Sequence, residues 1–174
     1  MENTKMVETN SDTVKEEISL QSAVKVSGRV ELQMVRLLEC SCKKIANCPT
    51  DNQTFNAEKT PTFQIDKEQN LIEVFIEFAL KAFSEGVEQK KENAYLEIEA
   101  TFCLLYHIQN MEGLDDNAFR SFAEFNGTYN AWPYWREFVQ NVTTRMGLPA
   151  LTIPVFRIAT SLKKEIDQEE SKNG

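Results

Sequence analysis

Four cysteines, one histidine and a closely spaced pair of glutamates are the residues of this chain best suited to chemistry. Cys40 and Cys42 stand two residues apart and Cys48 follows, but cysteine zinc sites usually contain a paired Cys-x-x-Cys, and this sequence has none. In an extended strand, Cys40 and Cys42 would lie on one face as small apolar residues. We therefore predict no metal site and, in a reducing compartment, four free thiols including Cys103.

The remaining candidates for catalysis are His107 and the pair Glu97 and Glu99. A nucleophilic triad would need His107 beside a serine or cysteine and oriented by a carboxylate, which nothing in the sequence positions. The two glutamates would project to one side of a strand, where they could form an acid–base pair, a solvated row of charge or a docking surface for a partner. We favour the solvated row, with docking as its main competitor. No glycine-rich phosphate loop occurs, so we expect no cofactor and a protein that is not an enzyme.

Composition limits how many domains the chain can form and which kinds of partner it can bind. The chain has 174 residues, 41% of them hydrophobic, and a formal charge of −8, which fits one domain and disfavours a sequence-independent grip on nucleic acid. A basic or partly unfolded protein partner would suit the charge better. No segment has the length and apolarity of a membrane span or a signal peptide, so we expect a cytoplasmic protein without membrane insertion. We expect a flexible polar tail over residues 1–27, one domain over 28–168 and a second tail over 169–174.

Alternating apolar residues predict three long strands. The first is expected from Val30 to Lys44, although its alternation is imperfect, with Val35 and Leu37 on the face opposite Val30 and Leu32. The other two are clearer, over residues 72–82 and 96–108, and their matching patterns predict an antiparallel pair. The stretch from Cys48 to Pro61 is rich in Asn, Asp, Thr and Pro and is expected to be a loop.

The second half of the chain predicts helices and one further strand. Helical spacing begins at Asp115 and ends at Phe125, where Asn126-Gly127-Thr128 is expected to break it. A second helix is expected from Pro133 to Met146, then an edge strand from Leu151 to Phe156 that contains Pro154, then a short helix from Ile158. The fold class predicted is α+β, with a four-stranded antiparallel sheet and helices packed on one face.

The order of these elements, and the motif that opens the second helix, resemble the SecB family of protein-export chaperones and its SecB-like relatives. The resemblance covers about Val30 to Phe156 and departs from the family where Phe156-Arg157 replaces its Asn-Phe. The motif is aromatic-Pro-Tyr-x-Arg-Glu, followed by a glycine and a proline-punctuated apolar stretch, and it is matched by Trp132, Pro133, Tyr134, Arg136, Glu137, Gly147, Pro149, Leu151, Ile153, Pro154 and Val155.

The resemblance implies an ATP-independent holdase, a homotetramer built as a dimer of dimers that binds unfolded or precursor polypeptides. It also implies either docking on the SecA motor for export or service as a solitary or toxin–antitoxin-associated chaperone whose client is an antitoxin. The side chains expected to contact clients are aromatic or aliphatic: Phe75, Phe83, Leu105, Phe125, Tyr129 and Trp132. Those expected to dock a partner are acidic: Glu73, Glu77, Glu97 and Glu99. The rival hypothesis is a small-ligand or lipid-binding α+β domain, in which the same aromatics line a closed pocket.

Overall fold

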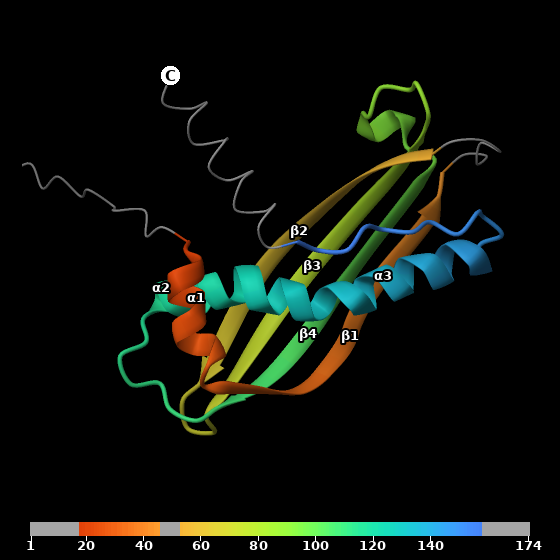
Figure 1. Cartoon of the computed structure of the whole chain (residues 1–174). Coiled ribbons are helices and arrows are strands. Elements are labelled where there is room, and N and C mark those ends of the chain that lie inside the picture. The colour runs from red at the N-terminus through yellow and green to blue at the C-terminus, as the bar shows by residue number, and fades with distance from the viewer. Residues whose placement is uncertain (1–17, 46–52, 158–174) are drawn as a thin grey trace, which may run out of the picture.

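One antiparallel sheet of four long strands is the frame of the molecule in the computed structural model, which describes residues 18–45 and 53–157 (Figure 1). The spatial order is β1-β4-β3-β2, and each neighbouring pair is antiparallel. The predicted antiparallel pairing of the two clearest strands, β3 and β4, is confirmed. The strand bounds are Val30–Lys44 for β1, Gln53–Asp66 for β2, Leu71–Ser84 for β3 and Leu96–Ile108 for β4, with a short 3₁₀ turn, η1 (Lys91–Asn93), between the last two.

The helical part is an almost continuous rod that crosses one face of the sheet (Figure 1). It consists of α2 (Asp116–Phe122), the π-helical turn η2 (Ala123–Gly127) and α3 (Thr128–Arg145). Asp115 caps α2 because its side chain accepts a hydrogen bond from the amide of Ala118 at 2.8 Å. Gly147, at φ +69°, ends α3 in the left-handed conformation that glycine adopts without strain.

Two predicted features of this rod are wrong. The expected break at Asn126-Gly127-Thr128 is a π turn, and α3 begins at Thr128, five residues before Pro133. The chain passes so close to the sheet that a Cβ on Gly127 would lie 2.6 Å from Val74 Cγ1. Glycine is therefore needed for close approach here, where the sequence analysis expected it to end a helix.

The fourth strand is also not the one predicted. Residues 53–61, expected to be loop, form the first half of β2, which pairs with β3 over its whole length. Residues 151–156, expected to be an edge strand, have no regular secondary structure. Two core-facing positions of β2 hold Lys59 and Pro61, and these interrupted the apolar alternation that would have revealed the strand. The fold class, a four-stranded antiparallel sheet with helices packed on one face, is confirmed.

The tail expected over residues 1–27 is in part a helix. Helix α1 (Leu20–Ser27) is capped by Ser19, whose side chain accepts from the amide of Ser22, and it buries Ala23 and Val26. The amide of Ser19 also donates to Ser121 Oγ of α2, which joins α1 to the rod. Residues 1–17, Cys48, the helix expected from Ile158 and the tail expected over 169–174 lie outside the described residues.

The core lies between the sheet and the rod. Even-numbered residues of β3 and β4 face α3, including Ile72 to Ala82 and Ile98 to Ile108. The predicted stripe of α3 packs onto them, with Trp135 stacked on Phe78 at 5.1 Å between ring centroids and Phe138 edge-on to Phe102. These aromatic contacts fill the space that a closed ligand pocket would need.

Candidate functional site

The sheet has two faces that differ in what covers them, and the predicted site residues divide between them. We call the face under α3 the helix side and the opposite face the open face. Phe75, Leu105 and the four predicted docking glutamates lie on the open face. They are odd-numbered residues of β3 and β4 that pair across the strands with other odd-numbered residues, whereas the core residues are even-numbered. Trp132 lies on the helix side. The structure therefore does not bring the predicted client-contact residues together into one site.

Two β-bulges decide which side chains of β1 reach each face. The register slips at Gln33 and at Leu38, so Val35 pairs with Leu104 and Leu37 with Phe102 on the helix side. The prediction that Val35 and Leu37 lie opposite Val30 and Leu32 is wrong for this reason. The second bulge also places Glu39 opposite Thr101 on the open face.

One end of the open face combines apolar side chains with a contact among Arg36, Glu73 and Cys103. Phe75 and Leu105 are half-buried there, and Met34 lies opposite Leu105. Beside them Arg36 pairs with Glu73 at 3.3 Å, and both groups lie within hydrogen-bonding range of the Cys103 thiol. Burial raises the pKa of Cys103, against a lowering by its hydrogen bond to Arg36. The thiol is thus held protonated and is a poor nucleophile.

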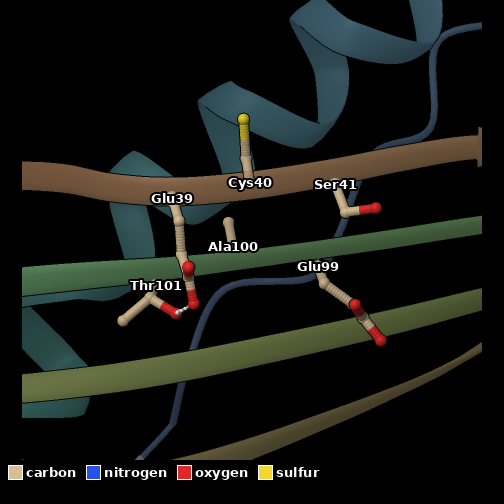
Figure 2. Close-up of a pocket in the computed structure, with 6 residues that line it drawn as sticks. All are labelled: Glu39, Cys40, Ser41, Glu99, Ala100 and Thr101. Carbon is tan, nitrogen blue, oxygen red and sulfur yellow. Dashed lines mark hydrogen bonds between the residues drawn. The ribbon is translucent and has the colours of Figure 1, made fainter.

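The middle of the open face is an acidic hollow, which the sequence analysis only partly found. Its volume is about 320 Å³, and its glutamates come from all four strands. Figure 2 shows Glu39 and Glu99 in a smaller pocket that shares these residues with the hollow, with Thr101 donating to Glu39 at 3.4 Å and Cys40 pointing away. Only Glu77 and Glu99 were predicted; the other two glutamates are Glu39, on β1, and Glu58, on the unpredicted strand β2.

The other two predicted docking residues are partly neutralised by their neighbours. Glu73 is paired with Arg36, as described above. Glu97 lies between Lys43 on β1 and Lys81 on β3 in the strand register. Negative charge is therefore concentrated at Glu77 and Glu99, with the strand neighbours Glu39 and Glu58. Among the described residues, no three His, Cys, Asp or Glu side chains are grouped so that they could hold a metal ion.

On the helix side, Trp132 holds the segment that follows α3. We call residues 148–157 the strap; Figure 1 shows it running back beside α3 over the sheet. Trp132 Nε1 donates to the carbonyl oxygen of Pro154 at 2.8 Å, and its ring packs on Phe78 and Phe156. Arg136 Nε donates to the carbonyl oxygen of Ile153 at 2.7 Å. The motif residues Trp132 and Arg136 thus bind main-chain carbonyl groups.

Three predicted client-contact residues have contrasting exposure. Phe83 and Phe125 are each 1% exposed, so neither reaches a bound chain without rearrangement. Tyr129, on the outer surface of α3, is 54% exposed, and Tyr134 lies near it in sequence and is also exposed. A role of these residues in client contact stays a prediction.

Exposed apolar side chains along β1 were not predicted from the sequence. Leu32, Met34, Leu37 and Leu38 are each at least 39% exposed, although large apolar residues in strands are usually covered. In the described part of the molecule, β1 pairs with β4 on one side and leaves its other edge open. The imperfect alternation of Val30–Lys44 was the available signal, since a bulged, exposed strand gives that pattern.

The cysteines of β1 do not form a reactive site with these residues. Cys40 and Cys42 face the helix side opposite Ala100 and Ile98, as expected from alternation in a strand. Burial, and then the nearby Cys40 thiol, raise the pKa of Cys42. Cys40, Cys42 and Cys103 are free thiols in the structure.

Comparison with known proteins shows which solved structure this fold resembles. No family model matches the sequence, and neither does any curated protein. Among solved structures, the Mycobacterium tuberculosis SecB-like chaperone Rv1957, in complex with a ChAD peptide from the Rv1956 HigA1 antitoxin, matches with a TM-score of 0.68 and 22% identity. The match covers 78% of this chain and 97% of that chain. The fold is SecB-like.

The SecB-like fold gives the observed surfaces a context without assigning their roles. A Streptococcus agalactiae protein of unknown function matches less well, with a TM-score of 0.42 and 12% identity over 72% of this chain and 96% of that one, and we draw nothing from it. Within residues 18–45 and 53–157, no helix has the length and apolarity to cross a membrane. The SecB-like frame therefore presents two distinctive surfaces: the apolar edge of β1 and the acidic hollow of the open face.

Proposed function

We propose that this protein is an ATP-independent holdase chaperone that binds unfolded or precursor polypeptides. The observation that carries the proposal is the exposed apolar surface of a well-packed SecB-like frame. Leu37 and Leu38 on β1 and Tyr129 and Tyr134 on α3 are all 44% exposed or more, while the core beneath them is closed. Exposed apolar side chains beside an open strand edge can bury the apolar residues of an extended chain and bond its backbone.

Among possible clients, an antitoxin segment has the most direct support. The SecB-like chaperone Rv1957 was solved with a peptide from an antitoxin. Docking on SecA for protein export has less support, because Arg36 pairs with Glu73 and two lysines flank Glu97, which leaves Glu77 and Glu99 as the effective charges of the predicted set. We place the protein in the cytoplasm with a solitary or toxin–antitoxin-associated role first and an export role second.

We further propose a homotetramer, a dimer of dimers, in which the open edge of β1 meets another copy. The two edges of the sheet differ in a way that supports this. The outer strand β2 carries Pro61, which cannot donate a ladder hydrogen bond, whereas β1 has 15 residues and no proline. A long edge that has no proline and carries exposed leucines is suited to pairing, although two bulges interrupt it.

A small-ligand or lipid-binding domain is supported less well than a holdase. Trp135, Phe78, Phe102 and Phe138 pack on one another in the space between helix and sheet. The hollows on the open face are shallow and lined with glutamates, which suits neither a fatty acid nor an apolar cofactor.

The experiment that tests the proposal is aggregation of a chemically denatured client, followed by light scattering after dilution with and without the protein. We expect suppression at stoichiometric amounts and without ATP. The mass, from size exclusion with multi-angle scattering, should be four times 20.0 kDa. Aggregation that proceeds unchanged at a several-fold excess of protein would contradict the holdase, and copurification of one small compound would favour the rival.

A further inference from the structure

The strap is held on α3 in the way that an extended peptide is held in a groove. Leu148, Leu151 and Ile153 are buried, while Thr152, Pro154 and Val155 face solvent. From Leu151 to Pro154 this is the alternation of a strand, yet the strap pairs with no strand of the described sheet. Alternate side chains enter the core surface, and the main chain stays at the surface of α3.

Three polar side chains on one side of α3 fix the main chain of the strap. Thr143 Oγ1 accepts from the amide of Leu151 at 3.2 Å, Arg136 donates to the carbonyl oxygen of Ile153, and Trp132 donates to that of Pro154. The residues on α3 descend in number as those of the strap ascend, so the strap runs antiparallel to the helix. These contacts are with main-chain atoms, which every polypeptide possesses.

The specificity of this groove therefore lies in its apolar positions. They take aliphatic side chains two residues apart, here Leu151 and Ile153, the latter 2% exposed. A hydrophobic, strand-forming segment of an unfolded protein has the same spacing on one face. The occupant seen in the structure thus defines the chemical class of segment that the groove accepts.

The attachment of the strap also permits exchange. Gly147, with φ +69°, joins the strap to α3, so a rotation there can carry the strap away without unwinding the helix. In the described residues after Pro149 no regular secondary structure has to be broken. A tethered segment has a local concentration of the order of millimolar, which a client with more apolar contacts can overcome.

We propose that the strap is an internal substitute for client, and that an extended segment with aliphatic residues at alternate positions displaces it and binds along α3 through Trp132 and Arg136. This rests on the proposed holdase function and adds the kind of segment that is bound and the contact that limits binding. Clients bind in competition with residues 148–157.

The test uses the full-length protein and a fluorescein-labelled peptide of residues 148–157 as the probe. Fluorescence anisotropy measures its binding to the wild type and to Ile153→Ser, which loosens the strap. Val155→Ser, at an exposed position of the same strap, is the matched control. A peptide with Leu151→Asp and Ile153→Asp controls for non-specific binding. Circular dichroism and thermal unfolding establish that each variant is folded.

We expect Ile153→Ser to bind the peptide at least about tenfold more tightly than the wild type, since burial of one aliphatic side chain is worth about that factor or more. Val155→Ser should match the wild type, and the aspartate peptide should bind neither. Should Ile153→Ser fail to fold, Pro149→Gly loosens the strap without touching the groove and should raise affinity about two- to fivefold through added freedom of the open state. The same variants should suppress client aggregation at lower concentration, and the unlabelled peptide should reverse that suppression.

Failure of this inference is separable from failure of the holdase. If the wild type suppresses aggregation but folded Ile153→Ser and Pro149→Gly bind peptide and client no more tightly, the strap is a fixed wall and the inference is overturned. If no version suppresses aggregation while Ile153→Ser binds the peptide tightly, the holdase is overturned and the displaceable strap is supported.

Discussion

At the scale of single residues, Gly127 permits a close approach of the helical rod to the sheet. A methyl group there would lie 2.6 Å from Val74 Cγ1, so a shift is required, and Val74 is fully buried and β-branched, which limits its rotamers. Helix propensity alone would favour alanine by about 1 kcal/mol. We expect the clash to outweigh it, so that Gly127→Ala lowers the free energy of unfolding by about 1–3 kcal/mol in urea denaturation.

Two further variants check this explanation. Gly28→Ala, where the nearest atom to the added Cβ is 3.9 Å away, should change stability by no more than about 0.5 kcal/mol. Val74→Ala in the Gly127→Ala background should recover part of the loss, because it removes the clashing methyl group. A Gly127→Ala variant as stable as the wild type would mean that the rod lies farther from β3.

Tyr106 provides a prediction about pH. Burial raises its pKa to about 12, although Asn130 Nδ2, donating to the phenol oxygen at 3.0 Å, works in the opposite direction. Below pH 10 the phenol is neutral in both the folded and the unfolded state, so the stability from this group is fully present. Between pH 10 and about 12 only the unfolded state ionises readily, and stability falls by about 2–3 kcal/mol.

The measurement is the free energy of unfolding of the wild type and Tyr106→Phe between pH 9 and about pH 12. Phenylalanine has no group to ionise, so the difference between the two proteins should shrink or reverse in favour of the variant as pH rises. Parallel curves for the two proteins would show that Tyr106 ionises as easily in the folded state as in the unfolded chain.

At the scale of elements, α1 packs on one end of the rod through few apolar residues. It buries Val26 but leaves Val24 60% exposed, so two valines on one short helix form a matched pair. We expect Val26→Ala to cost about 2 kcal/mol of unfolding free energy and Val24→Ala less than about 0.5. Thermal or urea unfolding measures both. Equal effects would mean that α1 does not pack on α2 in solution.

Alternation of apolar and polar residues in a sequence indicates a segment that is buried on one side. This explains which elements could be predicted and which could not. It located β3, β4 and the stripe of α3, because their apolar residues face a single core, and it located β1 from a less regular pattern. It missed β2, in which Lys59 faces inward to pair with Glu124 and Pro61 interrupts the apolar positions. It also turned the strap into a strand, since Leu151 and Ile153 alternate against a helix in the same way as against a sheet.

For the candidate site, too, local features limited which residues could be predicted from the sequence. Glu77 and Glu99 were predictable as outward-facing residues of clear strands. Glu39 was not singled out, although the bulges at Gln33 and Leu38 cancel and leave it on the face that alternation from Val30 gives. Phe83 was expected at the surface from strand alternation and Phe125 from the resemblance, but both are 1% exposed.

At the scale of the whole molecule, our proposals for assembly and for client binding both involve the open edge of β1. We expect the double variant Leu32→Lys, Leu37→Lys to weaken self-association by about 100-fold, because two exposed leucines beside the edge become charged where another copy would lie. Multi-angle scattering over a dilution series should show a smaller species than the wild type at the same concentration.

Val87→Lys, which alters an exposed apolar residue in the β3–β4 connection, is the control and should leave the mass unchanged. Both variants should retain the wild-type circular dichroism spectrum, since none of the three side chains is in the core. If the double variant keeps the wild-type mass, another surface joins the copies, and the leucines of β1 are then free for clients. Aggregation suppression separates these cases, because a client surface that is lost with the leucines lowers holdase activity even when assembly is intact.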